Sequence, residues 1–461
     1  MGSNSFATTS RHIAVIGAGA AGLVAARELR RQTHTVVVFE RSHSIGGTWI
    51  YTPDTESDQL GGVDRNCNIL HGSLYDSLRT NLPRECMGFL DYPFVGIEDH
   101  RRFPHHKEVL RYLQAFGRDF GIEKLVRFGT EVVGVEMGFH DKWIVKTRCV
   151  DDVIVGKQDP LPPHVAASEV YDGVVICNGH YTEPRIAEIQ GIMAWPGKQL
   201  HSHNYRVPKP FADQVMVLIG ASASSFDISK ELARFAKEVH IASRSEDPIG
   251  TPKKLSGYDN MWIHPMIERA NEDGTILFQG GYSFRVDTIM HCTGYKYHFP
   301  FLKTDDIVTV EDNRVGSLYK HIFPPSLAPG LSFIGLPWKV IPFPMFELQS
   351  KWVAMILSGQ VTLPSVEDMA NDVNEFYEEL ESIGYPKRYT HNLAGQQFKY
   401  NDFLATQCGY TAIEEWRKGM YEATSKNRIV RPETYRDVWD DGCLVEKAQN
   451  DFNLWRINFK A

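Results

Sequence analysis

The chain has 461 residues, of which 43% are hydrophobic and 23% are charged, an ordinary mixture for a globular protein long enough for two or more domains. Its 49 basic and 57 acidic residues give a net charge of −8 without any block of like charge, which argues against nucleic acid as the main partner. The sequence lacks the apolar core of a signal peptide and the roughly 18 apolar residues of a membrane span, and its seven cysteines form no C-x-x-C pair, so we expect a cytoplasmic protein with no membrane partner.

The first predicted element is a strand–helix–strand unit over residues 13–40. An apolar strand at 13–16 runs into a G-x-G-x-x-G segment and an alanine-rich helix that continues through Arg31, and a second strand at 35–39 ends on Glu40. This order predicts a dinucleotide site, because the glycines allow a tight turn and let backbone N–H groups at the helix N-terminus approach a pyrophosphate. An ordinary tight turn is the alternative. Glu40 can accept hydrogen bonds from a ribose 2′-OH but repels a 2′-phosphate, which favours FAD or NAD over NADP. The candidate residues are Gly17, Ala18, Gly19, Ala20, Ala21, Gly22 and Glu40.

Later stretches supply further candidates for the first cofactor. The G-G-x-W run at 46–49 suits close backbone approach, and its tryptophan can pack on an aromatic ring system or serve as a partly buried anchor. Asn81 precedes a proline turn, where its amide can donate and accept, although a turn cap is the simpler interpretation of this residue alone. Alternating strands over 126–177 predict a small antiparallel unit that returns to the main sheet. The candidates in these stretches are Arg41, Gly47, Trp49, Arg79, Thr80, Asn81, Val132, Asn178 and Gly179.

A second strand–helix–strand unit begins at Val215, with its helix expected at 226–236, and departs from the first motif. Ser222 and Ser225 stand where the second and third glycines would be, and serine is small enough for close approach to a phosphate. The next strand, 238–242, is followed by Ser243 and Arg244, and an arginine at this point can bind a 2′-phosphate, which favours NADP(H). A solvated surface charge is the alternative for this arginine. The candidates are Gly220, Ala221, Ser222, Ala223, Ser224, Ser225, Ser243, Arg244 and, after a strand ending near 291, Cys292, Thr293 and Gly294.

Together these units predict an α/β fold with two Rossmann-like dinucleotide-binding domains, the NADP domain being inserted into the FAD domain. The expected segments are 1–204 for the first part of the FAD domain, 205–328 for the NADP domain, and 329–461 for the return of the FAD domain with C-terminal helices. The return is expected to contain a helix at 343–359 with the candidate Gln349 near its start. A loop is expected at 151–168 and an acidic, solvated helix at 364–384. We expect no metal site, and the sequence leaves the oligomeric state open.

The sequence resembles the flavin-containing monooxygenases in several further stretches. Their fingerprint F-x-G-x-x-x-H-x-x-x-Y/F is matched by Trp195, Gly197, His201 and Tyr205, with tryptophan in place of phenylalanine. The G-G-x-W run, the segment 79–94 and the T-G-Y run at 293–295 also match the family. Within the family, the runs NLPRE, CNGHYTEP and HSHNYRVP are most similar to plant S-oxygenating members.

The resemblance implies an enzyme that uses FAD, NADPH and O2 to convert a small thioether to a sulfoxide. The implied substrates are S-alk(en)yl-cysteines or methylthioalkyl glucosinolates, and the implied reactive species is a flavin hydroperoxide at C4a, whose distal oxygen a sulfur attacks. In this scheme the catalytic residue is Asn81, which hydrogen-bonds NADP+ and the flavin adduct. Tyr205 and Arg206 are the candidates for holding the nicotinamide half of NADP(H).

Three alternatives stay open on the sequence. A disulfide reductase has the same two-nucleotide layout but needs a redox-active cysteine pair, and no C-x-x-C or C-x4-C pair is present. A Baeyer–Villiger or N-oxygenating monooxygenase would use the same intermediate. A non-catalytic NADP(H) sensor would bind nucleotides without turnover, and NADPH-dependent oxygen uptake with a substrate would distinguish it.

Overall fold

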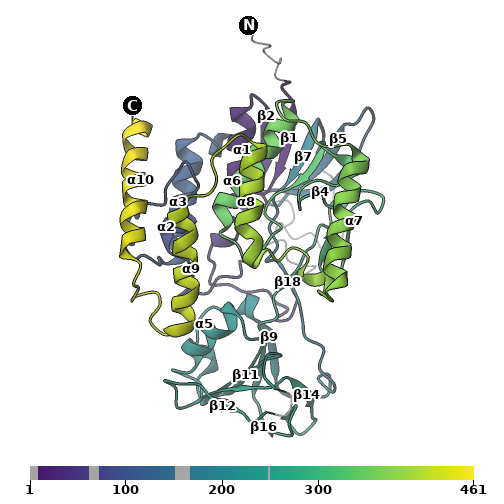
Figure 1. Ribbon diagram of the computed structural model, residues 1–461. Helices are drawn as coiled ribbons and strands as arrows, with labels where there is room; N and C mark the ends of the chain where they lie inside the picture. The colour runs from purple at the N-terminus through teal and green to yellow at the C-terminus, as the bar shows by residue number, and fades with distance from the viewer. Residues whose placement is uncertain (1–8, 62–71, 151–166, 248–249, 461) are drawn as a thin grey trace. The chain divides into compact units, whose positions relative to one another are not determined.

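The computed structural model describes residues 9–61, 72–150, 167–247 and 250–460. The chain divides into two packed units: unit 1 is Met1–Ile50, Leu78–Gly179 and Phe299–Ala461, and unit 2 is Tyr51–Ser77 and His180–His298. Each unit contains its own largely parallel sheet (Figure 1). The loop expected at 151–168 lies outside the described residues except for its last two, which begin strand β6 (Ala167–Tyr171).

The chain passes from one unit to the other at 50/51, 77/78, 179/180 and 298/299, and the last two crossings come earlier than the predicted domain boundaries at 204/205 and 328/329. Strand pairing explains both differences. Strands β8 (Glu183–Pro184) and β9 (Lys198–His201) pair with β18 (Tyr295–Lys296) and β17 (Thr288–His291) of unit 2. Strand β19 (Leu302–Lys303) pairs with β4 (Thr130–Met137) of unit 1. The assignment of a cofactor to each predicted segment stays a prediction.

Unit 1 is built on a five-stranded parallel sheet with the order β22–β7–β1–β2–β3. Its strands are β1 (His12–Ile16), β2 (Thr35–Phe39), β3 (Val126–Arg127), β7 (Gly173–Ile176) and β22 (Leu331–Phe333). The central strands are short apolar runs, as expected for strands covered on both faces, and Val15 pairs in register with Val38 and Val175. Helix α1 (Ala20–Arg31) connects β1 to β2, so the predicted strand–helix–strand order is present at the predicted residues.

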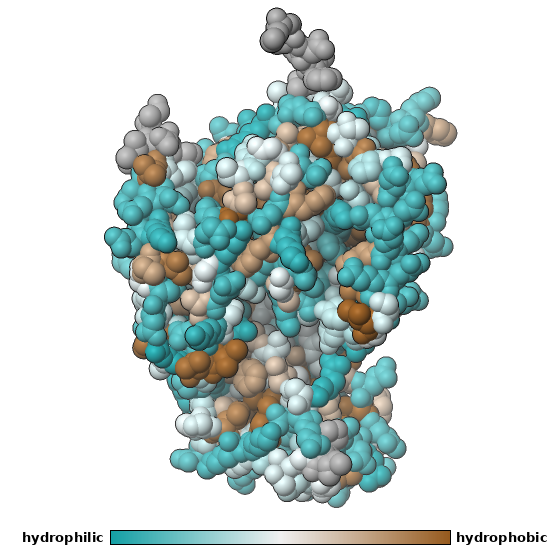
Figure 2. All heavy atoms as spheres, viewed as in Figure 1, coloured by the Kyte–Doolittle hydropathy of each residue, from teal (hydrophilic) through white to brown (hydrophobic). Residues whose placement is uncertain are grey.

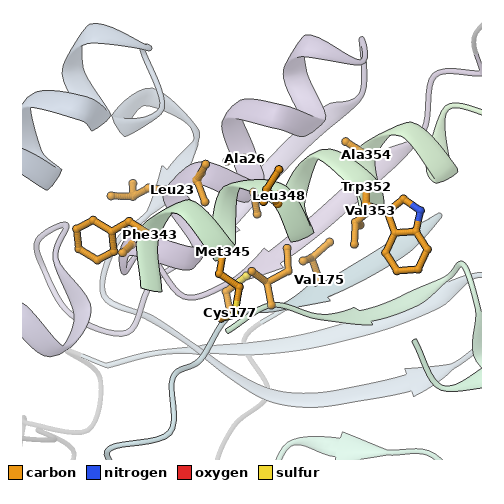
Figure 3. Close-up of a cluster of buried hydrophobic side chains, with 14 of the residues drawn as sticks. Leu23, Ala26, Val175, Cys177, Phe343, Met345, Leu348, Trp352, Val353 and Ala354 are labelled. Atoms are coloured by element: carbon orange, nitrogen blue, oxygen red, sulfur yellow. The ribbon is translucent and has the colours of Figure 1, made fainter. Parts of the chain in front are cut away.

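Helix α6 (Pro342–Leu357) forms the centre of the unit 1 core, close to the predicted range 343–359. It is apolar nearly all round, which is typical of a helix that is buried along its whole length. Figure 3 shows its side chains from Phe343 to Ala354 packed next to Leu23 and Ala26 of α1 and to Val175 of β7.

Ion pairs cross this core and reach the segment that follows Asn81. Arg27 of α1 contacts Asp91 at 2.6 Å and Glu347 of α6 at 3.1 Å, and Lys351 contacts Glu347 at 2.6 Å. The three carboxylates Glu28, Asp91 and Glu347 are the one group among the described residues that lies close enough together to hold a metal ion. Because these cations already neutralise them, the cluster is a buried ion-pair network that ties residue 91 to the two core helices.

The remaining elements of unit 1 surround this core. Strands β4, β5 and β6 form the predicted antiparallel unit, with β19 added parallel to β4. The acidic helix predicted at 364–384 is α7, which buries only Met369 and Val373 and presents a largely hydrophilic surface (Figure 2). The other bounds are β5 (Trp143–Cys149), β20 (Thr309–Glu311), β21 (Arg314–Gly316), α2 (Arg84–Met87), α3 (His106–Asp119), α7 (Val366–Ser382), α8 (Gln397–Gln407), α9 (Glu415–Val430) and α10 (Gly442–Lys460).

Unit 2 is built on a six-stranded sheet with the order β12–β13–β11–β10–β17–β9, parallel except for the β12–β13 pair. Its helix α5 begins at Ala223, three residues before the predicted start, because Ser222 is the N-cap. The bounds are β10 (Val215–Ile219), α5 (Ala223–Leu232), β11 (Glu238–Ala242), β12 (Lys253–Lys254), β13 (Met261–His264), β14 (Ile267–Ala270), β15 (Thr275–Phe278) and β16 (Ser283–Arg285). Among the described residues of both units, no helix combines the length and apolar character needed to cross a bilayer.

Candidate active site

The turn after β1 needs glycine at two positions for reasons internal to the fold. Gly17 has a φ of +104°, and a Cβ on it would lie 2.5 Å from the carbonyl oxygen of Cys177. A Cβ on Gly22 would lie 1.8 Å from the carbonyl oxygen of Gly17. Both distances are far below van der Waals contact, so the first and third glycines of the motif set the tight turn and allow α1 to pack against the strand ends.

The second glycine of the motif is not required by the fold. Gly19 has extended backbone, with φ −76° and ψ −174°, and the nearest atom to a Cβ there would be the Cα of Gly47 at 3.5 Å. Gly19 is the N-cap of α1 and offers no side chain to the N–H groups of the first turn. Ala18 and Ala20 are buried beside this turn, and Ala21 is half-buried. The result is a bare helix N-terminus bordered by two glycine backbones, which fits a pyrophosphate.

Glu40 follows β2 and is almost buried. Its Oε2 accepts the N–H of Ala18 at 2.7 Å, and its Oε1 accepts the N–H of Ser42 at 2.8 Å. A carboxylate has further lone pairs, so Glu40 holds the turn and can still accept a bond from a ribose hydroxyl. Arg41 instead contacts Glu131 of β4 at 3.6 Å, and Trp49 is half-buried against the unit 1 core.

Gln349 is fully buried and its amide is used within the fold. Its Oε1 accepts the N–H of Gly335 at 3.0 Å, and its Nε2 donates to the hydroxyl of Tyr400 at 2.8 Å. The side chain therefore holds the turn after β22, which counts against direct contact between its amide and a cofactor. Val132 is buried in β4. At the end of β7, Asn178 is half-buried and Gly179 is exposed.

Asn81 lies at the start of a turn whose backbone is held in place. The N–H of Thr80 donates to the carbonyl of Pro104 at 2.9 Å, and Nε of Arg79 donates to the carbonyl of Phe103 at 2.9 Å. The Asn81 side chain is exposed, and its amide has no hydrogen-bond partner among the described residues. The structure therefore presents an accessible carboxamide on an ordered backbone.

In unit 2 the turn after β10 repeats the geometry of the first motif with two serines. Gly220 has the same φ of +104°, and a Cβ on it would lie 2.7 Å from the carbonyl oxygen of Cys292. Ser222 has extended backbone that serine adopts without strain, and its hydroxyl makes no capping bond. Ser225 lies in the first turn of α5 but is fully buried, so its hydroxyl is not accessible to a phosphate at the helix N-terminus. The candidates at the open end of α5 are Ala221, which is half-buried, and Ser222, Ala223 and Ser224, which are exposed.

The residues after β11 separate into a buried serine and an exposed arginine. Ser243 is 2% exposed, and its hydroxyl is hydrogen-bonded to that of Ser245 at 2.7 Å. Arg244 is exposed, as a residue that binds a 2′-phosphate must be. Of the two predicted phosphate contacts, the arginine is therefore the one whose side chain is accessible.

The residues that follow β17 form a second glycine corner in unit 2. Cys292 is buried, and the hydroxyl of Thr293 donates to the carbonyl of Arg185. Gly294 has a φ of +81°, and no atom lies within 4 Å of a Cβ built there. The open space above Gly294 fits the close approach predicted for this position.

The fingerprint residues hold the fold of unit 2 together. Trp195 belongs to its core, and a Cβ on Gly197 would lie 2.1 Å from the Trp195 indole. Nδ1 of His201 accepts the N–H of His203 at 3.0 Å, so Nε2 carries the proton and donates to the carbonyl of Gly294 at 3.1 Å. Burial, together with neighbouring histidines, lowers the pKa of His201 to about 3 and keeps the ring neutral. This histidine therefore positions the corner that follows β17.

Tyr205 and Arg206 are bonded to partners within unit 2. Tyr205 is 1% exposed, and its hydroxyl donates to Glu231 at 2.7 Å. Arg206 is 6% exposed, and its guanidinium donates to the carbonyls of Thr52, Asp54, Gly72, His203 and Tyr205. This arrangement counts against the predicted contact with the nicotinamide half and favours a role in holding residues 52–54 and 72 to the corner at 203–206.

Two residues that the sequence did not single out lie next to the Asn81 turn. Nε of Arg436 donates to the carbonyl of Thr80 at 2.9 Å, and Nη1 of Arg417 donates to the carbonyl of Cys86 at 2.6 Å. No motif marks either arginine, since single arginines in a helical tail have the pattern of solvated charges.

Comparisons with known proteins agree with this geometry over nearly the whole chain. A family model described as flavin-binding monooxygenase-like matches residues 10–260 and 252–412. Flavin-containing monooxygenase FMO GS-OX-like 5 of Arabidopsis thaliana is 56% identical over 455 residues, which cover 97% of this chain and 98% of that relative. The predicted family is therefore confirmed.

Solved structures confirm the predicted fold class. The S-allyl-L-cysteine S-oxygenase from Allium sativum is 58% identical with a TM-score of 0.92, and the match covers 97% of this chain and 100% of that one. The OTEMO complex with FAD and NADP, at 14% identity and a TM-score of 0.58 over 88% of this chain and 100% of that one, shares the fold. The chain belongs to the flavin-binding monooxygenase family, which uses FAD and NADPH, and within it to the plant S-oxygenase type.

Proposed function

We propose that this protein transfers one oxygen atom from O2 to the sulfur of a small thioether of the S-alk(en)yl-cysteine or methylthioalkyl glucosinolate class. The balanced reaction is NADPH + H+ + O2 + thioether → NADP+ + H2O + sulfoxide. The observation that carries this proposal is the similarity, at 58% identity and over 97% of the chain, to a protein described as an S-allyl-L-cysteine S-oxygenase.

The first motif supports FAD as the resident cofactor of unit 1. The N–H groups at the start of α1 would bind the pyrophosphate between the backbones of Gly19 and Gly47, and Glu40 would accept a ribose hydroxyl. Bound FAD, once reduced by NADPH, supplies the activation of O2 for transfer to a nucleophilic sulfur. The protein's own part is to bind, orient and shield the reacting groups from water.

The second motif supports NADPH as the nucleotide of unit 2. The open N-terminus of α5 would bind its pyrophosphate, and the exposed guanidinium of Arg244 would bind the 2′-phosphate. Ser243 contributes less than the sequence indicated, because its hydroxyl is already bonded to Ser245. Arg244 is thus the residue proposed to set the preference for NADPH over NADH.

Asn81 is proposed to act at the reaction centre. Its exposed amide can donate one bond and accept another at the same time, which suits simultaneous contact with the nicotinamide amide and the flavin.

All the described cysteines are free thiols, which fits a protein that acts in the reducing environment of the cytoplasm.

A substrate panel tests the proposal. Purified protein with FAD and NADPH would be given S-allyl-cysteine, a methylthioalkyl glucosinolate, a tertiary amine and a cyclic ketone, and NADPH use would be compared with product mass. We expect close to one sulfoxide per NADPH with at least one thioether. An N-oxide or a lactone as the main product, with no sulfoxide, would replace the proposed reaction with N-oxygenation or Baeyer–Villiger oxidation.

A further inference from the structure

The C-terminal arm of unit 1, residues 414–455, packs on the Asn81 segment, residues 79–91. Figure 1 shows α9 of the arm beside α2 of the Asn81 segment. Trp416 and Met420 of α9 share a buried apolar cluster with Cys86. Polar contacts add to this apolar packing at several points along the segment.

Arg417 closes the carboxyl end of α2. It is 1% exposed, and its Nη1 donates to the carbonyls of Glu85, Cys86 and Gly88 at 3.1, 2.6 and 3.0 Å. Glu414 compensates its charge, accepting from Nε and Nη2 at 2.8 and 3.1 Å. The last carbonyls of a helix have no partner within the helix, so Arg417 supplies the donors that hold this single turn in place.

Arg436 acts directly beside Asn81. Its Nε donates at 2.9 Å to the carbonyl of Thr80, which belongs to the same peptide group as the N–H of Asn81. Because a peptide group is planar, a bond to this carbonyl also fixes the direction of the Asn81 N–H. The next residue, Asp437, forms an ion pair with Arg79 at 2.9 Å.

Two further contacts hold the neighbouring backbone. Asp441 binds the buried guanidinium of Arg102 at 2.7 Å, and the carbonyl of Arg102 accepts the N–H of Arg84 at 2.9 Å. Trp455 donates its Nε1–H to the carbonyl of Asp91 at 2.8 Å. Most of these bonds reach carbonyl groups of the Asn81 segment, so the arm determines where the backbone of the segment lies and leaves its exposed side chains accessible.

We propose that the C-terminal arm positions Asn81 for oxygen transfer and that Arg436 is the positioning residue that orients the Thr80–Asn81 peptide. This inference rests on the proposed function of Asn81. The side-chain amide of Asn81 has no partner of its own among the described residues, so the Cα–Cβ direction that its backbone sets decides which region the amide can reach. Catalytic geometry tolerates small displacements poorly, and a misplacement of about 1 Å can cost roughly 10²-fold in rate.

The test compares Arg436→Met with Arg428→Met, a control on an exposed arginine of the same arm. Both variants should fold, bind stoichiometric FAD and melt near the wild-type temperature. We expect Arg436→Met to bind NADP+ about fivefold more weakly, the net value of one hydrogen bond, in a titration that follows the flavin spectrum. Its NADPH use should shift from sulfoxide to H2O2, while Arg428→Met behaves as wild type. Arg436→Lys, which keeps a cationic donor, should restore part of both losses.

A double-mutant cycle with Asn81→Leu separates positioning from general destabilisation. If Arg436 acts through Asn81, Arg436→Met should change NADP+ affinity little once Asn81→Leu is present, whereas independent effects would add. A loss that persists in the Asn81→Leu background, or an Arg436→Met variant with wild-type NADP+ affinity, would overturn the inference. A different result, the absence of sulfoxide from reactions of the wild-type protein, would refute the proposed function. The NADP+ titrations decide the role of Arg436 in either case.

Discussion

Gly19→Ala should separate the binding of FAD from the stability of the fold. A Cβ on Gly19 would meet the Cα of Gly47 at 3.5 Å, which is ordinary contact, and its φ of −76° suits alanine. The apoprotein should therefore keep its stability within about 1 kcal/mol, the scale of strain-free glycine-to-alanine changes. The added methyl group would occupy the side of the turn proposed for the pyrophosphate.

The expected loss of FAD affinity follows from the bonds at that helix end. A hydrogen bond from a backbone N–H to a charged phosphate contributes about 1.5–3 kcal/mol. Losing one of them corresponds to roughly a 10- to 150-fold weaker FAD complex, at about 1.4 kcal/mol per factor of ten. Gly22→Ala should behave differently, because its Cβ would lie 1.8 Å from the carbonyl oxygen of Gly17 and must disturb the apoprotein itself.

The assay measures two quantities on the same samples: unfolding of the apoprotein by denaturant and FAD affinity by fluorescence titration. Gly395→Ala is the matched control, because no atom lies within 4 Å of a Cβ at that position. We expect Gly19→Ala to bind FAD weakly while its apoprotein stays stable. We expect Gly22→Ala to lose both FAD affinity and apoprotein stability. If Gly19→Ala bound FAD with wild-type affinity, the assignment of the pyrophosphate to this helix end would be refuted.

Three further predictions follow from the same contacts. Arg244→Ala should weaken NADPH binding by roughly 10- to 150-fold and narrow the preference over NADH, with Arg234→Ala as an exposed control; unchanged cofactor selectivity would move the 2′-phosphate site elsewhere. Asn81→Leu should keep FAD and its reduction by NADPH but divert turnover to H2O2, and a wild-type sulfoxide yield would remove Asn81 from the mechanism. Burial lowers the pKa of His240 and His264 to about 4, so below pH 6.5 the unfolded chain binds more protons than the folded one. Stability should therefore fall from pH 6.5 toward pH 4, by up to about 1.4 kcal/mol per pH unit for each histidine, and a melting temperature that is equally pH-dependent in His240→Gln would contradict this cause.

The parts of the fold that the sequence predicted well are those that local signals determine. The strand at 35–39 and the helix ending at Arg31 are found at the predicted residues, because short apolar runs and glycine turns are signals that act within a few residues. The helix start at Ala223 was three residues off, because a serine N-cap and a serine inside the helix look alike in sequence. The open N-termini of α1 and α5 likewise follow from the motifs alone.

The parts that the sequence did not predict depend on which atoms meet across long separations. Arg206 was expected to face a nicotinamide, but its donors are used by carbonyls up to 154 residues away. Arg417 binds the carbonyls of α2 from 329–332 residues further along the chain. Residue type shows that an arginine can donate up to five bonds, but only the three-dimensional structure shows which acceptors are within reach. The same argument applies to Gln349, whose amide is used by Gly335 and Tyr400.

The two nucleotide motifs of this chain show that G-x-G-x-x-G combines constraints of different origin. The first glycine is imposed by the backbone in both units, since Gly17 and Gly220 share a φ of +104°. The third is imposed only where the helix lies against the turn: Gly22 has no room for a Cβ, whereas Ser225 is accommodated in a fully buried position. The second position has extended backbone in both units, so neither fold forbids a side chain there. A glycine at this position is therefore explained by the space that the ligand needs. The serine of unit 2 implies that the phosphate bound there either lies further from the turn or accepts a bond from the Ser222 hydroxyl.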